Sequence, residues 1–363
     1  MQPPTPTPDS DATIVIRPPA PSPPPRRGRW QAVAVVAIVV LAGAGGAAWL
    51  LRPHPAPPPA PAAPAPAAPA PVATTAPPAP AAAPTSPPPP PAPPPAPAPA
   101  PFSITTADEA AIAAHVATTL SVFRFAAAPA VMVLDFPTLA EQGQMLNRMA
   151  ALIEKAKLPR DRVLTDAELA AAIHASGDTP ETYYYGHDYS AADLARFFAL
   201  ADRDHVALDA EEAKLRALLT QLGWFAPDAV GALISVPAVG ADAFVTRQAR
   251  EAMLHHELSH GIFFSSPAYA DYVRHFWRTA LTEQERASVR SFLGSQDYDT
   301  TDEDLMLNEM QAYVMFTYDP RFCKAVNVGM TLARRLELIA KFRDGLPEGW
   351  PKEALEHPSL LPQ

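Results

Sequence analysis

Hydrophobic and polar residues divide the chain into a proline-rich first part and a patterned second part. After residue 101, apolar positions recur every three to four residues in several stretches, which predicts amphipathic helices. Short apolar runs predict two strands, at 131–136 and 231–239. We therefore expect a mainly α fold with a small β-sheet (α+β). The expected helices cover residues 108–122, 139–157, 165–175, 191–200, 211–222 and 242–264.

Residues 30–51 form an uncharged apolar segment. As a helix it would be about 33 Å long, which matches the hydrocarbon core of a bilayer. Three arginines, Arg26, Arg27 and Arg29, stand directly before it, and Arg52 follows it. The positive-inside rule then predicts a single-pass membrane protein with a cytoplasmic N-terminus and a periplasmic or extracellular C-terminal part. A cleaved signal peptide, with Ala42-Gly43-Ala44 as the cleavage site, is the alternative interpretation.

Two proline-rich regions flank this transmembrane helix. Residues 1–29 are polar and bury little, so we expect a disordered cytoplasmic tail. Residues 52–101 are almost entirely proline and alanine, which predicts an extended polyproline II linker. Such a linker would let the remaining chain work away from the bilayer, through a cell-wall layer for example.

Charge and cysteine content exclude several kinds of site. Residues 1–101 contain five Lys or Arg and two Asp or Glu, so residues 102–363 contain 23 and 36, a net charge of −13. An acidic surface argues against nucleic acid as a partner. Cys323 is the only cysteine, which rules out an intramolecular disulfide and a cysteine-rich zinc site. We expect it to be a buried apolar residue.

The sequence His256-Glu257-Leu258-Ser259-His260 has the form H-E-x-x-H, within a stretch that predicts a helix. Positions i and i+4 of a helix share one face, so both imidazoles can reach one Zn²⁺ ion. Glu257 would lie beside them as a general base that takes a proton from metal-bound water. The pattern thus predicts a metal site with hydrolytic chemistry.

A second predicted helix supplies an acid. Thr301 to Asp304 have the composition of a helix N-terminus, and an apolar stretch follows with Glu309 as its lone acid. A carboxylate in an apolar stretch is costly to bury without a partner. A zinc ion held by two neutral histidines would provide one.

The motifs HELSH (256–260) and NEMQAY (308–313) together resemble the gluzincin, or thermolysin-like, group of zinc metallopeptidases. The resemblance covers about residues 231–316 and implies a zincin-like fold. It implies His256, His260 and Glu309 as zinc ligands and Glu257 as the base. By the same resemblance, the strand at 232–236 corresponds to the edge strand that aligns the peptide substrate in this group. In one departure, Glu309 lies 49 positions after His260, more than in the compact thermolysin-like arrangement.

Alternatives remain for two roles. An aspartate of the acidic segment 297–302 could be the third ligand or orient a histidine, and His275 is the next histidine along the chain. Peptide hydrolysis also needs a hydrogen-bond donor to the oxyanion that forms on the scissile carbonyl. This donor could be Tyr313, one turn after Glu309. It could instead come from the aromatic segment 183–189, in which the candidates are Tyr183, Tyr184, Tyr185 and His187.

The sequence predicts a helical region at 102–230 and a zinc metallopeptidase-like catalytic region at 231–363, with a peptide or protein as substrate. The helical region could be a separate domain or cover the cleft. Cell-wall peptide is one substrate class that a long linker would suit. A non-catalytic, metal-containing binding or scaffold module of the cell envelope is the alternative, although such a module has no need of a base beside the metal.

Overall fold

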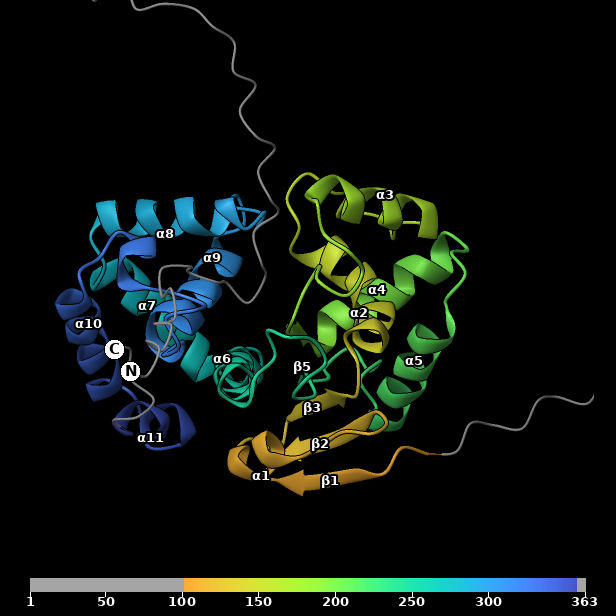
Figure 1. The fold of residues 1–363 in the computed structure, drawn as a ribbon, viewed down its shortest axis with the longest axis horizontal. Helices are drawn as coiled ribbons and strands as arrows, with labels where there is room; N and C mark the ends of the chain where they lie inside the picture. Colours follow the sequence, from red (N-terminus) through yellow and green to blue (C-terminus); the bar gives the residue numbers. More distant parts are fainter. Residues whose placement is uncertain (1–100, 358–363) are drawn as a thin grey trace, which may run out of the picture. The chain divides into compact units, whose positions relative to one another are not determined.

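A computed structural model of the protein describes residues 101–357. The predicted tail, the transmembrane helix at 30–51 and the linker up to residue 100 lie outside these residues, as do residues 358–363. Within 101–357, every helix is too short or too polar to cross a membrane. The described residues form a mainly helical fold with one small mixed sheet, which confirms the predicted α+β class (Figure 1).

The sheet has five strands in the order β1-β2-β3-β5-β4. β1 runs parallel to β2 and β3 parallel to β5, whereas the β2–β3 and β5–β4 pairs are antiparallel. The predicted regions 102–230 and 231–363 both contribute, because β5 lies between β3 and β4. The strands are β1 (Ile104–Ala107), β2 (Ser121–Phe125), β3 (Val131–Phe136), β4 (His187–Ser190) and β5 (Ala232–Pro237).

The expected edge strand is not at the edge. β5, predicted from the run at 231–239, pairs with a neighbour on each side, and all six of its residues are buried. The edge strand next to β5 is β4, whose sequence His-Asp-Tyr-Ser has too little apolar alternation to stand out within the aromatic segment. A strand that is buried on both faces has a continuous apolar sequence, so the apolar run at 231–239 is typical of an internal strand.

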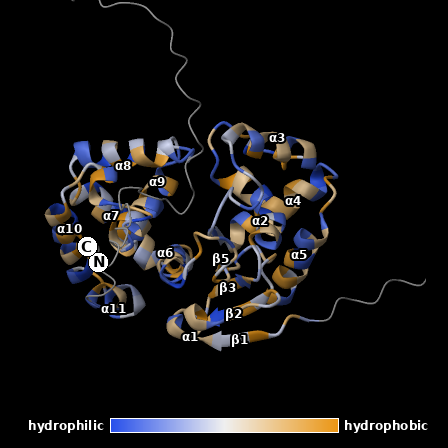
Figure 2. Ribbon diagram, viewed as in Figure 1, coloured by the Kyte–Doolittle hydropathy of each residue, from blue (hydrophilic) through white to orange (hydrophobic). Residues whose placement is uncertain are grey.

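Alternate residues of β3 and β5 point into two cores on opposite faces of the sheet. Val131 and Val133 join the core formed with α6–α11, whereas Met132 and Leu134 join the core formed with α2–α5. The helices of both layers carry hydrophobic as well as polar residues (Figure 2). Each layer therefore buries one face of its helices against the sheet.

The first helical layer follows the predicted pattern except at its start. The helix expected at 108–122 ends at Ala114, and residues 121–125 form β2 instead. Alanine favours a helix locally, but Val122 and Phe125 are buried in the sheet, and tertiary packing overrides propensity. This short helix, α1 (Glu109–Ala114), lies on the other face of the sheet, where Ile112 joins the core that includes α6. The helices of the first layer are α2 (Leu139–Ile153), α3 (Asp166–Ser176), α4 (Ala191–Arg203) and α5 (Ala210–Leu222).

The second layer begins with α6 (Arg247–Ser265), the helix that carries H-E-x-x-H. The predicted second motif helix is α9 (Glu303–Met310), which continues directly into a π-helical segment, η1 (Gln311–Phe316). The remaining elements are α7 (Pro267–Thr279), α8 (Glu283–Ser295), η2 (Ala325–Val328), α10 (Leu332–Asp344) and α11 (Trp350–Glu356).

Arg250 ties α6 to the sheet. Its fully buried guanidinium forms an ion pair with Asp135 of β3, with N···O distances of 2.8 and 2.9 Å. It also donates to the carbonyls of Pro237, at 2.6 Å, and Ile112, at 2.8 Å. Gly261 lets the helix approach β3 closely, since a Cβ there would lie 2.7 Å from Val131 Cγ1. The motif helix is therefore held at a fixed depth on the sheet.

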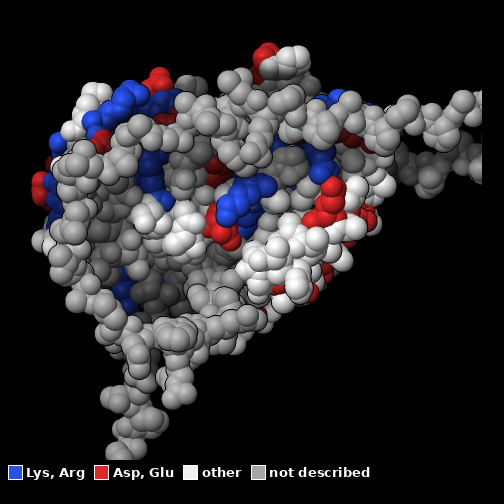
Figure 3. Space-filling model, turned by 90° about the horizontal axis from the view of Figure 1, so that it is seen from above, with Lys and Arg blue, Asp and Glu red and all other residues white. Residues whose placement is uncertain are grey.

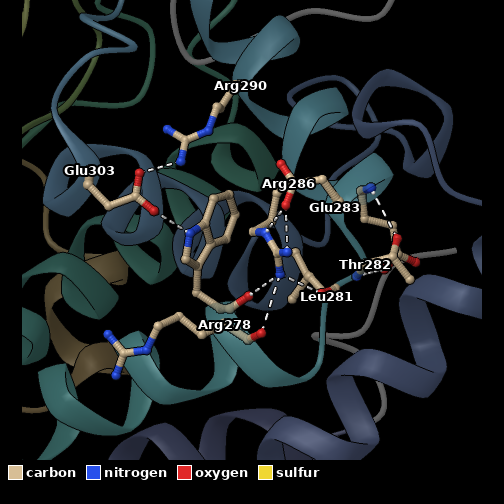
Figure 4. A network of polar contacts seen from close by, with 9 residues as sticks. Arg278, Leu281, Thr282, Glu283, Arg286, Arg290 and Glu303 are labelled. Atoms are coloured by element: carbon tan, nitrogen blue, oxygen red, sulfur yellow. Dashed lines mark hydrogen bonds and ion pairs between the residues drawn. The ribbon is translucent and has the colours of Figure 1, made fainter.

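Glu303, in the first turn of α9, ties that helix to α7 and α8 (Figure 4). It accepts a hydrogen bond from Trp277 Nε1 at 2.6 Å and forms an ion pair with Arg290. Arg286 of α8 donates to the carbonyl oxygen of Trp277 in the last turn of α7 and to that of Leu281, just after the helix. These bonds fix the start of the helix that carries Glu309.

Ion pairs also cover the exposed surface. Arg162 pairs with Glu168, and Arg216 pairs with Asp202. On the face shown in Figure 3, basic side chains stand beside acidic ones. Isolated exposed pairs of this kind contribute little to stability.

Candidate metal centre

His256 and His260 lie one turn apart on α6, and their Nε2 atoms are 3.0 Å from each other. Two ligands of a tetrahedral zinc ion, each bound at about 2.0–2.1 Å, lie about 3.3 Å apart. Both rings are buried, and burial lowers the pKa of His256 well below its usual value and that of His260 to about 4. Both imidazoles are thus neutral at neutral pH, which is the form that binds a metal.

Thr317 fixes the tautomer of His256. Its hydroxyl donates to the carbonyl of Ala312 at 3.0 Å, so its single proton is used there. The same oxygen lies 2.7 Å from His256 Nδ1 and must accept a proton from it. The lone pair of His256 is consequently on Nε2, the atom that faces His260. No sequence motif indicated Thr317, which follows η1.

Glu309 is the acid that the fold brings to the two histidines. Its Oε2 lies 3.9 Å from His260 Nε2, and the ligand atoms of His256, His260 and Glu309 all lie within 4.8 Å of one another. Burial raises the pKa of Glu309 well above its usual value, as do the nearby Glu154 and Glu257, while a hydrogen bond with Tyr298 opposes the shift. Oε2 has no hydrogen-bond partner within residues 101–357. A cation between this oxygen and the imidazoles fits the site.

Glu257 is buried beside these ligands and faces the segment that leads into β4. A Cβ on Gly186 would lie only 2.0 Å from Glu257 Oε1, so the backbone passes directly against the carboxylate. The other oxygen, Oε2, has no hydrogen-bond partner within the described residues. Burial raises the pKa of Glu257 well above its usual value, and Asp188 and Glu154 raise it further.

Asp188, on the edge strand β4, is a site residue that sequence reasoning missed. Its Oδ1 lies 3.6 Å from His260 Nδ1, just beyond hydrogen-bond distance, and Nδ1 has no hydrogen-bond partner within the described residues. A small shift would let the carboxylate orient the ring. Asp188, Glu257 and His260 also bring ligand atoms within 4.8 Å of one another. The only available signal was an acid within an aromatic segment, which is also typical of a loop.

A polar network joins the two motif helices behind the histidines. Gln311 donates to Ser259 Oγ at 3.1 Å and to Asn308 Oδ1 at 3.3 Å. Tyr269 donates to Gln311 Oε1 at 2.8 Å, and Ser259 donates to the His256 carbonyl at 2.7 Å. The NEMQ segment therefore supports the α6 histidines through Asn308 and Gln311 as well as through Glu309.

The oxyanion-donor candidates lie in different surroundings. The Tyr313 ring packs edge-on against His256, with 4.7 Å between centroids, and its hydroxyl shares a hydrogen bond with Tyr298. Tyr185 donates its hydroxyl proton to Asp242 at 2.5 Å, and His187 Nδ1 lies 3.0 Å from Ser235 Oγ. Lys155 Nζ lies over the rings of Tyr183 and Tyr184, at 4.3 and 4.4 Å from the centroids.

The alternative third ligands have other roles. Asp299 pairs with Arg160 at 3.2 Å, and Asp302 caps α9 through the backbone N–H of Leu305. His275 is exposed, and Cys323 is buried as expected. Within residues 101–357, neither set of metal-ligating atoms includes these aspartates.

A cavity of about 700 Å³ lies beside α9, and none of the two histidines, Glu257 and Glu309 is among its lining residues. Asn308 of α9, next to Glu309, is one of its lining residues. The apolar part of the lining includes Phe263 and Phe264 at the end of α6, and the polar part includes Arg160 and Arg196. A volume of this size accommodates a short peptide segment.

Comparison of the chain with protein families, with curated proteins and with solved structures yields no match. The functional interpretation therefore rests on the geometry of the centre itself.

Proposed function

We propose that this protein is a zinc-dependent peptidase of the gluzincin type. The observation that carries the proposal is the convergence of His256, His260 and Glu309, all buried, with Glu257 beside them. Two neutral imidazoles and one carboxylate form a ligand set that catalytic zinc uses, with a fourth position left for water or substrate. Other divalent metals accept nitrogen and oxygen ligands, so metal analysis has to identify the ion.

The chain's own residues have distinct parts in this hydrolysis. When bound, zinc would polarise a water molecule and the scissile carbonyl. Glu257 would take the proton of the attacking water and pass it to the leaving amine. Thr317 and Asp188 would hold the rings of His256 and His260. Tyr313, whose ring packs on His256, is the proposed donor to the carbonyl oxygen.

The proposed substrate is a peptide or protein, and cell-wall peptide is one class of it. The cavity beside Asn308 is the proposed place for the part of the substrate next to the scissile bond. The proposed location is the non-cytoplasmic side of the membrane, with residues 30–51 as the anchor and 52–101 as the linker. Both segments lie outside the described residues, apart from Pro101 at the end of the linker.

A non-catalytic metal-containing module is the second candidate. The observation in its favour is the burial of the centre, since the exposed fraction of Glu257 is 2% and that of His260 is 0%. In a peptidase, the segment through Gly186 would have to move before a peptide could reach Glu257. The two candidates differ in whether the protein cleaves peptides when metal is bound.

To separate them, the full chain would be purified in mild detergent and its zinc content measured for the wild type, Glu257→Gln and Glu309→Ala. Casein cleavage would be followed in parallel. We expect about one zinc per chain in the wild type and in Glu257→Gln, reduced zinc in Glu309→Ala, and cleavage by the wild type alone. Zinc without cleavage of casein or of cell-wall peptide would favour the non-catalytic module. A wild type that binds no added zinc would refute both.

A further inference from the structure

A second cavity, of about 540 Å³, lies among α1, α6 and α11. Carboxylates at its wall come from all three helices or their caps, and three aromatic rings complete the lining. None of the described residues that line it is a lysine or an arginine. The carboxylates belong to Asp108, Glu109, Glu251 and Glu353, and the rings to Phe125, Tyr318 and Trp350.

Two of the carboxylates are available to a ligand. Glu109 accepts hydrogen bonds from Trp350 Nε1 and His255 Nδ1, each at 2.8 Å, so it is already occupied. Glu251 and Glu353, in contrast, have no hydrogen bond or ion pair within residues 101–357. Glu251 is half-buried and Glu353 is exposed, and neither carboxylate has a cationic partner among the described residues.

The aromatic wall is rigid. One face of the Trp350 indole stacks on Phe316, with 5.6 Å between centroids and 11° between planes, and Phe125 meets it edge-on. His255, fully buried, packs against the rings of Trp350 and Tyr318, and its Nε2 has no hydrogen-bond partner within the described residues. Aromatic rings attract cations through their quadrupoles, and more strongly where water is excluded.

The spacing of the carboxylates argues against a metal ion. In the described residues, the only groups of three acids or histidines with ligand atoms within 4.8 Å of one another are those of the α6 centre. A calcium ion needs several oxygens at about 2.3–2.6 Å, which the cavity does not bring together. Separated carboxylates and aromatic rings instead suit an extended cation with an apolar stem.

We infer that this cavity is a binding site for an alkylammonium group, as carried by a polyamine or by a lysine side chain. The inference does not depend on the proposed peptidase function, because no residue of the zinc centre takes part. Glu251 nevertheless precedes His255 by one turn of α6, so the site shares a helix with the H-E-x-x-H motif.

The test uses calorimetric titration of the full chain in detergent with spermidine and, separately, with N-acetyl-lysine amide. The variant is Glu251→Gln with Glu353→Gln. Its control is Glu181→Gln with Glu356→Gln, which removes the same charge at two exposed positions outside the cavity lining. We expect the protein with Glu251→Gln and Glu353→Gln to bind each probe that the wild type binds roughly tenfold more weakly. The control protein should bind it as the wild type does.

A second variant tests the aromatic wall. Tyr318→Leu should weaken binding of tetramethylammonium about threefold, which loss of charge alone would not explain. Binding of spermidine alone would identify a free polyamine as the source, and binding of both probes a lysine side chain as well. The inference is overturned if neither probe binds, if both variant pairs weaken binding equally, or if calcium binds stoichiometrically and is lost with Glu251 and Glu353.

Discussion

The backbone at Gly186 lies directly against the carboxylate of Glu257, at a distance that leaves no space for a Cβ atom. The two residues come from different parts of the fold, the segment before edge strand β4 and the motif helix α6. This contact places the proposed general base against the aromatic segment, which the sequence had suggested only as a source of an oxyanion donor.

Replacing Gly186 by alanine should therefore impair catalysis more than metal binding. The new methyl group would displace the end of the Glu257 side chain, and a misplacement of about 1 Å costs on the order of 10²-fold in rate. Peptidase activity and zinc content of the full chain would be measured together. Gly294→Ala is the control, since a Cβ there would lie 3.2 Å from the Thr300 methyl group. Unchanged activity in Gly186→Ala would argue against Glu257 as the base.

Thr317→Val should weaken zinc binding. Valine keeps the shape of the side chain but cannot accept the Nδ1 proton of His256, so the ring loses its fixed tautomer. Loss of such a supporting hydrogen bond typically weakens metal affinity by about 10–100-fold. Competition with a chromophoric chelator would give the affinity. Thr317→Ser restores the hydroxyl and should recover most of it, whereas equal affinities in all three proteins would exclude this role for Thr317.

Arg250→Met should destabilise the whole fold. Removing one partner of a fully buried ion pair leaves Asp135 with His115, 2.6 Å away, as its remaining partner, and we expect a loss of up to about 3–5 kcal/mol in the free energy of unfolding. Urea denaturation of the full chain would measure it. Arg203→Met removes an exposed pair with Asp204 and should change stability little. A small effect of Arg250→Met would show that α6 is held on the sheet by packing alone.

His187 should make stability depend on pH below neutrality. Burial lowers its pKa from 6.5 to about 3, so between these values the unfolded state binds the additional proton. The contribution of His187 to the free energy of unfolding is therefore present above pH 6.5 and is lost as the pH falls towards 3. The free energy of unfolding falls by up to about 1.4 kcal/mol for each pH unit. Buried Glu212, whose pKa is raised to about 7, acts in the opposite direction between 4.5 and 7.

Because of that opposition, the informative quantity is the difference between His187→Gln and the wild type. Free energies of unfolding at pH 7 and pH 5 would be compared for both proteins. We expect a weaker loss of stability on acidification in His187→Gln. An identical pH dependence would mean that His187 is accessible to protons in the folded state.

Local sequence signals predicted the parts of the fold that depend on neighbouring residues. The i, i+4 spacing of His256 and His260 and the lone acid Glu309 indicated the three groups that the fold brings together. The helix expected at 165–175 is α3, and it begins where Thr165 and Glu168 form a capping box. Each of these features is fixed by helix geometry within one or two turns, so it could be recognised without tertiary information.

The tertiary structure alone decided which distant residues complete the centre. Asp188 reaches His260 only because β4 pairs with β5, and Thr317 reaches His256 only because η1 follows α9. The same long-range pairing placed β5 inside the sheet rather than at its edge. Strand order and contacts between distant segments depend on how the whole core packs, which the local pattern of hydrophobic and polar residues does not encode.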